Sequence, residues 1–157
     1  MYILICIFIF LCIYIYGYYK YPANVSILQT SLREFSSSML LEKQPLILED
    51  KTIDISKIKN TLFKYNYTQS FHLKQSEIWN YNRYKYCIIQ FENDGEIYLI
   101  QPGTKIENNI PLENEKLLGI QGKQGQILIL PLHWHYMILD TSVNCIGTHD
   151  MITYFLP

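Results

Sequence analysis

The chain has 157 residues and a formal net charge of −1 at neutral pH. This length suits one domain of ordinary size, and the near-zero charge excludes an electrostatic basis for binding nucleic acid. The chain's four cysteines are too few for a disulfide scaffold. Within a folded domain only Cys87 and Cys145 can pair, and two free thiols buried in strands are the alternative.

Residues 2–19, YILICIFIFLCIYIYGYY, form an uncharged apolar run. As a helix with a rise of about 1.5 Å per residue, the run is about 27 Å long, enough to cross a hydrocarbon core. Tyrosines gather at its C-terminal end, where an aromatic belt lies among lipid headgroups. The sequence therefore predicts a single-pass membrane anchor over residues 1–21 that contacts the lipid bilayer through residues 2–19.

A cleaved signal peptide is the competing interpretation of this run. No basic segment precedes the run, and no small-x-small cleavage site follows it, so the uncleaved anchor is favoured. Lys20 and Arg33 follow the run, and the positive-inside rule then favours a domain on the cytosolic side of the membrane.

Residues 22–43 are expected to form a helical connector between the anchor and the domain. Apolar side chains at helical spacing give it one stripe, made of Leu28, Leu32, Phe35 and Met39. A strand is expected over residues 45–49. Asp54 is expected to cap a second helix over residues 55–65.

Short apolar runs between turn residues dominate residues 44–157. They predict about eight strands in a closed or sandwiched antiparallel barrel. Residues 84–102 are expected to form a β-hairpin, because Asp-Gly at its centre favours a tight turn. Residues 103–116 are polar and predict a surface loop, and residues 151–156 are expected to form the last strand.

Residues 125–140, GQILILPLHWHYMILD, are the most informative stretch. The apolar run 126–130 is too short for a helix and too uniform for an edge strand, which predicts a strand buried on both faces. Pro131 cannot donate a backbone hydrogen bond and is expected to end that strand at a turn. A second strand is expected over residues 134–139.

This stretch resembles the second conserved motif of the cupins, G-x(5)-P-x-G-x(2)-H-x(3)-N, with Gly125 and Pro131 in place. It also resembles the phrase GD-x-L-x-I-P-P-x-W-W-H of JmjC-type hydroxylases, with Trp134 at the first tryptophan. Tyr136 falls where both motifs place a metal-binding histidine. A form with tyrosine at this position is familiar from cupin-like membrane proteins of large DNA viruses.

A second segment is similar to another JmjC-type phrase, H-x-D-x-x-x-N-x-x-x-Q-x-x-G-x-K-x-x-x-L-x-x-P. Gln90, Gly95 and Pro102 fall close to its glutamine, glycine and proline. This alignment puts Asn80 and Asn82 near its histidine and aspartate. The two resemblances imply a mainly β fold with N-terminal helices, namely a cupin-like double-stranded β-helix, or jelly-roll barrel, preceded by a transmembrane helix.

The resemblance also implies a function. A non-haem iron oxygenase needs two histidines and one carboxylate on one face, but the matching positions hold Asn80, Asn82 and Tyr136. We therefore expect a catalytically degenerate, membrane-anchored domain without a cofactor and with a structural or adaptor role. Its expected setting is the membrane or virion of a large DNA virus, with other membrane or virion proteins as partners. Residues expected to line a ligand pocket are Trp134, Tyr136, Tyr98, Asn80 and Asn82.

The alternative is an enzyme or a binding cupin that uses a different metal site. His133-x-His135 puts two imidazoles on one face of a strand, as zinc ligands often are, and His149 offers a third ligand. Fe(II) or Zn would then support oxygenation or hold a small molecule. If Tyr136 points into the barrel, however, strand alternation turns His135 outward, which argues against a metal at the barrel centre.

Overall fold

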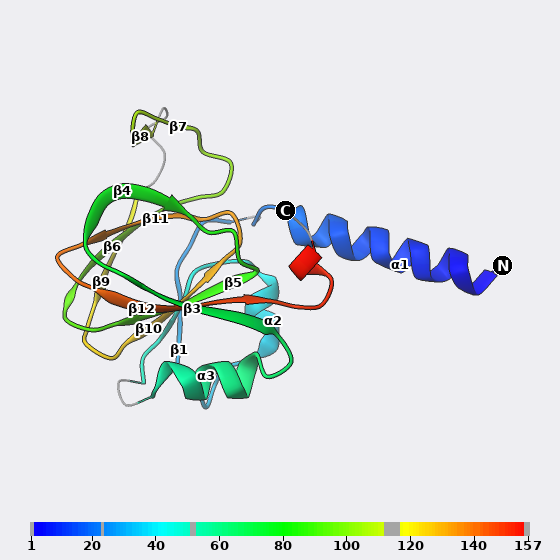
Figure 1. The fold of residues 1–157 in the computed structure, drawn as a ribbon, viewed down its shortest axis with the longest axis horizontal. Helices are drawn as coiled ribbons and strands as arrows, with labels where there is room; N and C mark the ends of the chain where they lie inside the picture. The colour runs from blue at the N-terminus through cyan, green and yellow to red at the C-terminus, as the bar shows by residue number, and fades with distance from the viewer. Residues whose placement is uncertain (1, 23, 51–52, 112–116, 156–157) are drawn as a thin grey trace.

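The computed structural model describes residues 2–22, 24–50, 53–111 and 117–155. It has a mainly β body and one apolar helix, α1 (Tyr2–Tyr19), that extends away from the body (Figure 1). Most of α1 is exposed, and Tyr18 at its C-terminal end is buried against the body. The predicted helix is confirmed. It is long and apolar enough to cross a membrane, a property that a signal sequence shares.

Two sheets make up the β body, and a small hairpin stands apart from them. Successive strands alternate between the two sheets, both from β3 to β6 and from β9 to β12. The six-stranded sheet contains, in spatial order, β1 (Leu28–Thr30), β2 (Leu46–Leu48), β10 (Ile127–Pro131), β5 (Tyr86–Phe91), β12 (Val143–His149) and β3 (Tyr67–Leu73). The four-stranded sheet contains, in spatial order, β4 (Ser76–Tyr81), β11 (His135–Leu139), β6 (Gly95–Ile100) and β9 (Leu118–Gly122). The hairpin consists of β7 (Ile106–Glu107) and β8 (Ile110–Pro111).

The body has two hydrophobic cores, one on each face of the six-stranded sheet. The first lies between the two sheets, and the second lies under α2 (Ser37–Leu41) and α3 (Ile55–Leu62). β10 contributes to both, because Leu128 and Leu130 face the first core while Ile127 and Ile129 face the second. The prediction of a strand buried on both faces is therefore confirmed.

The helix predicted after Asp54 is also confirmed, although it ends at Leu62 rather than at residue 65. The Asp54 carboxylate accepts a hydrogen bond from the Ser56 amide at 3.1 Å, so one of the amides without a partner inside α3 is satisfied. Ile58 is fully buried in the second core, while Lys57 on the opposite face is exposed.

The helical connector expected over residues 22–43 is wrong. Residues 28–30 form β1, which pairs in parallel with β2, and of the described residues in this range, 22 and 24–43, only the five of α2 are helical. The Gln44 side chain accepts a hydrogen bond from the Ser26 amide at 2.9 Å and helps hold this segment extended. Serines at 36–38 favour a cap over a helix interior, which delays the start of the helix. The four residues of the apolar stripe still pack on the second core. The sequence therefore predicted correctly that they are buried, but not that their backbone is mostly non-helical.

The hairpin expected over residues 84–102 is wrong as well. Both strands exist, but β5 and β6 lie in different sheets. A Cβ atom at Gly95 would lie 2.4 Å from the Cβ of Thr141, so glycine is needed here for a close approach. The chain uses this point to cross from one sheet to the other, and the Asp94 side chain accepts a hydrogen bond from the Gln124 amide at 2.7 Å.

Two further local predictions change. The loop predicted over residues 103–116 contains the β7–β8 hairpin, in which Asn108 and Asn109 adopt positive φ angles of 50° and 65°, while residues 112–116 lie outside the described residues. In place of the strand expected over residues 151–156, the chain forms a 3-10 turn, η1 (Thr153–Phe155), and residue 156 lies outside the described residues. The Asp150 carboxylate accepts hydrogen bonds from the first amides of this turn, so the backbone curls rather than extends.

Candidate functional site

Two of the residues predicted to line a pocket belong to the first core. Trp134 is fully buried, and its indole donates a hydrogen bond to the Lys43 carbonyl at 3.0 Å. Tyr136 is buried between the sheets, and burial raises the pKa of its phenol well above the usual range. The phenol therefore stays protonated, which makes it a poor metal ligand.

Asn82 is a structural residue. Its side-chain amide donates to the carbonyls of Leu130 at 2.9 Å and Pro131 at 2.7 Å, and its side-chain oxygen accepts from the Tyr84 amide at 3.0 Å. Its backbone carbonyl accepts a hydrogen bond from the His133 amide. These contacts tie the segment after β4 to the turn between β10 and β11, and they leave no amide donor directed at a ligand.

The other two predicted lining residues lie elsewhere. Asn80 is half-buried in β4 and donates to the Ile78 carbonyl at 3.2 Å. Tyr98 lies in β6 between the buried residues Ile97 and Leu99, and its hydroxyl donates to the Glu96 carboxylate at 3.0 Å. Because residues on a strand alternate, Tyr98 faces away from the first core. The five predicted residues therefore do not form one pocket.

The three histidines of the alternative metal site lie at the same end of the body, each against aromatic rings. His133 and His135 pack on Tyr81, and His149 packs on Tyr84. Burial lowers the pKa of all three imidazoles. Among the described residues, no group of three or more His, Cys, Asp or Glu side chains is placed to hold a metal ion.

Cys87 and Cys145 are both buried and free. They face the first core from neighbouring strands β5 and β12. Of the two interpretations of these cysteines, the structure has the free thiols.

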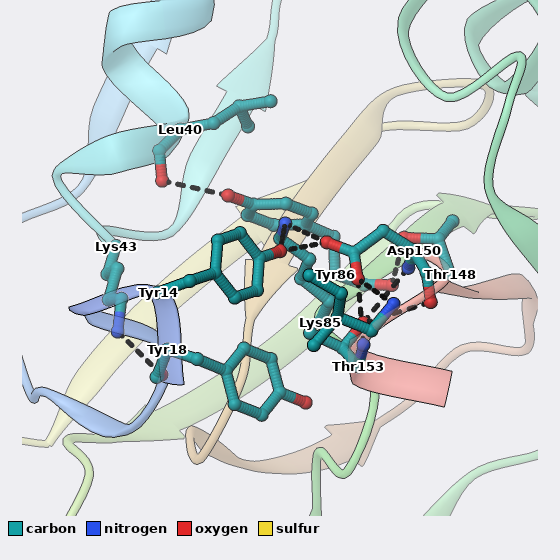
Figure 2. A network of polar contacts seen from close by, with 10 residues as sticks. Tyr14, Tyr18, Leu40, Lys43, Lys85, Tyr86, Thr148, Asp150 and Thr153 are labelled. Carbon is teal, nitrogen blue, oxygen red and sulfur yellow. Dashed lines mark hydrogen bonds and ion pairs between the residues drawn. The ribbon is translucent and has the colours of Figure 1, made fainter. Parts of the chain in front are cut away.

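A network of polar contacts joins α1 to the body, and Figure 2 shows this junction. Lys43, just after α2, donates from its ammonium group to the carbonyls of Gly17, Tyr18 and Lys20. The last carbonyls of a helix have no partner within it and carry partial negative charge, so Lys43 acts as a cap for α1. Burial, followed by repulsion from Lys85 and Lys20, lowers the pKa of Lys43 to about 8.

A second contact joins α1 to the body one turn earlier. Tyr14 donates a hydrogen bond to the Asp150 carboxylate, and the Lys85 ammonium contacts both groups, at 2.7 Å from the Tyr14 hydroxyl and paired with Asp150 (Figure 2). Burial alone would raise the pKa of Asp150. The hydrogen bonds from Lys85, the Thr153 backbone and Tyr14 outweigh burial and hold that pKa well below its usual range.

A cavity of about 480 Å³ lies between these two contacts. The Tyr86 hydroxyl borders it and donates to the Leu40 carbonyl at 3.1 Å. Its wall combines ammonium groups and phenols with aliphatic side chains: Tyr14, Gly17, Tyr18, Lys20, Tyr21, Pro22, Leu40, Leu41, Glu42, Lys43, Lys85, Tyr86, Pro131 and Leu132. These groups donate hydrogen bonds and carry positive charge, so the arrangement is suited to holding α1 against the body.

Sequence reasoning missed this junction. Tyr14 and Asp150 are 136 positions apart, and Lys43 is 25 positions from Tyr18. The sequence offers one sign of the junction, a charged residue at the end of a buried strand: Lys85 directly precedes β5, and Asp150 directly follows β12. Such ends carry charge in many domains, and only the fold brings these two together.

No protein-family model matches the chain, and no curated protein matches it significantly.

Proposed function

We propose that this protein is a membrane-anchored, non-catalytic β domain with a structural or adaptor role, held in a fixed orientation on its own transmembrane helix. The observation that carries the proposal is the double contact of α1 with the body through Lys43 and through the Lys85–Asp150 pair. Taking ammonium groups out of water has a cost that only good partners offset. These contacts fix the orientation of the body relative to α1. A fixed orientation is useful to a domain that presents one face to partners, but not to a domain that hangs from a flexible linker.

The fold we propose is a cupin-like double-stranded β-helix, that is, a jelly roll. A jelly roll has eight strands in two sheets. If the strands β3, β4, β5, β6, β9, β10, β11 and β12 are renumbered one to eight, the sheet orders are 1-8-3-6 and 2-7-4-5, which supports this assignment. The motif residues Gly125 and Pro131 bracket β10, and Tyr136 lies in β11, as the resemblance implies.

The degenerate character has its own support. Of the three positions where the resembling oxygenases hold iron ligands, Tyr136 is a buried phenol and Asn82 binds backbone carbonyls. A side chain that satisfies the backbone in this way is not free to bind a metal. By the same resemblance, the setting we propose is the membrane or virion of a large DNA virus, with other membrane or virion proteins as partners.

Membrane anchoring is tested by alkaline carbonate extraction of membranes that contain the full-length protein. We expect the protein to stay in the membrane pellet. In the matched variant Ile9→Arg, a charge at the helix centre costs about 2.5–3.5 kcal/mol of insertion free energy, so a larger fraction should be extracted. Full extraction of the unmodified protein would contradict the proposal.

The non-catalytic role is tested by metal analysis of the purified protein, together with an assay for 2-oxoglutarate turnover. Stoichiometric iron with turnover would overturn it. The double variant His133→Ala/His135→Ala addresses the alternative metal site, and we expect its metal content to equal that of the unmodified protein.

A further inference from the structure

We infer that the turn at residues 150–155 is a second membrane contact, which inserts apolar side chains into the interface of the same bilayer that α1 crosses. This inference rests on the proposed membrane anchor and adds a lipid-facing surface to it. We call this surface the C-terminal patch and define it as Met151, Tyr154, Phe155 and the neighbouring Tyr67.

The side chains of the C-terminal patch are exposed, and its three aromatic rings lie against one another. Met151, Tyr154 and Phe155 are 69%, 55% and 77% exposed. The Tyr154 ring lies 4.7 Å from that of Tyr67 and 5.3 Å from that of Phe155, measured between centroids. Large apolar side chains gathered on a surface mark a contact with a partner or a membrane.

The position of the patch identifies the bilayer as its partner. Asp150, immediately before the patch, accepts a hydrogen bond from Tyr14 of α1. Ile152, inside the turn, lines a groove together with Leu11 and Tyr14 on the same helix. The turn is thereby fixed against a helix whose exposed side chains are themselves expected to face lipid, so the patch continues that lipid-facing surface.

The depth of the turn agrees with an interfacial location. Tyr14 lies five residues before Tyr19 at the end of α1, which at about 1.5 Å per residue is about 7–8 Å along the helix axis. Figure 1 shows η1, drawn in red, beside α1 on the side from which the helix leaves the body. When α1 spans a bilayer, the turn therefore lies below the level of the helix end, in the range of about 5–10 Å at which interfacial segments are buried.

The chemistry of the turn also suits this depth. Tyrosine is enriched at membrane interfaces, where its ring is apolar and its hydroxyl reaches water. The charged residue in the turn, Asp150, is paired with Lys85, and both side chains are three-quarters buried. Insertion of the patch therefore does not bring an unpaired carboxylate into the lipid.

The inference is tested by fluorescence of the full-length protein in phosphatidylcholine vesicles whose acyl chains are brominated near the headgroup. The variant Phe155→Trp places an indole in the patch. The matched control is Ile110→Trp, because Ile110 is 66% exposed in the β7–β8 hairpin, which lies far along the body from η1 in Figure 1. The unmodified protein, with Trp79 and Trp134, gives the baseline.

We expect the added emission of Phe155→Trp to move to shorter wavelength and to be quenched by the brominated lipid, while that of Ile110→Trp is not. Flotation of the protein with the same vesicles reports anchoring by α1 separately. Retained flotation without quenching of Phe155→Trp, or equal quenching in both variants, would overturn the inference and leave the anchor intact. Loss of flotation in the unmodified protein would instead overturn the proposed function, and with it this inference.

Discussion

Asn82 and Pro131 are joined by a buried hydrogen bond, in which the Asn82 amide donates to the Pro131 carbonyl at 2.7 Å. The bond closes the turn between β10 and β11, where the resemblance to cupins and JmjC-type hydroxylases is strongest. A position that the resemblance assigns to a metal ligand here holds the backbone instead. Restoration of a carboxylate at this position is therefore a direct test of the degenerate character.

The first prediction concerns Asn82→Asp. A carboxylate has no hydrogen to donate to the Leu130 and Pro131 carbonyls, and its charge is buried against them. We expect a loss of about 3–5 kcal/mol in the free energy of unfolding, measured by urea denaturation. The control Asn80→Asp changes a half-buried residue that donates one bond to Ile78, and about 1 kcal/mol is expected. Iron uptake by the first variant without loss of stability would contradict a structural role for Asn82.

The second prediction concerns the pair at the junction. Lys85→Met leaves the partly buried Asp150 carboxylate without its cation, and we expect a loss of about 2–3 kcal/mol, less than for a fully buried pair because both side chains keep one quarter of their exposure. The double variant Lys85→Met/Asp150→Asn should recover part of this loss, since no unpaired charge remains. Thermal unfolding in detergent measures both effects. Lys57→Met, on the exposed face of α3, should shift stability by less than about 0.5 kcal/mol. Additive losses in the double variant would show that the two residues do not act as a pair.

Elements whose conformation is set by neighbouring residues could be predicted from the sequence, whereas elements set by contacts distant in the sequence could not. The uniform apolar run before Pro131 predicted β10 correctly, because burial on both faces requires that composition. Asp54 predicted the start of α3, because a cap acts on amides two residues away. By contrast, Asp94-Gly95 predicted a hairpin turn, but the chain changes sheets at this point and packs Gly95 against Thr141, which is distant in the sequence.

The same distinction applies to the connector and to the site. Leu28 and Leu32 have helical spacing, yet a backbone pairing of residues 28–30 with β2 decides their conformation. Lys43 and Lys85 look like ordinary surface cations in the sequence. Their role follows from a helix end that lies between 23 and 71 positions away from them, and no local pattern encodes such a contact.

The third prediction is a loss of stability in mild acid. Burial lowers the pKa of His133, His135 and His149, so the folded state binds fewer protons than the unfolded state once the pH falls below about 6.5, the ordinary histidine value. The free energy of unfolding should therefore be highest above this pH and decrease between pH 6.5 and pH 5. Asp150 does not contribute in this window, because its stabilisation is lost only below the ordinary carboxyl pKa of about 4. Urea midpoints at pH 7.5 and 5.0 measure the effect, and the double variant His135→Gln/His149→Gln should reduce it, because only His133 of the three histidines then remains. An unchanged slope in that variant would assign the acid sensitivity to other groups.

The last prediction concerns where the folded body begins. Deletion of residues 1–19 removes the Tyr14 contact and two of the three acceptors of Lys43, the carbonyls of Gly17 and Tyr18, but leaves every described strand in place, so a cooperative melt should persist with a loss of about 1–3 kcal/mol. Deletion of residues 1–43 also removes β1 and α2 and uncovers the outer face of β2, where Leu46 and Leu48 are almost fully buried. Several apolar side chains worth about 1.5–3 kcal/mol each then lose their cover, which is comparable to the whole stability of a domain of about 5–15 kcal/mol. Circular dichroism should therefore show a cooperative melt for the first truncation and none for the second. A cooperative melt of residues 44–157 alone would mean that β1 and α2 are accessory to the body rather than part of its core.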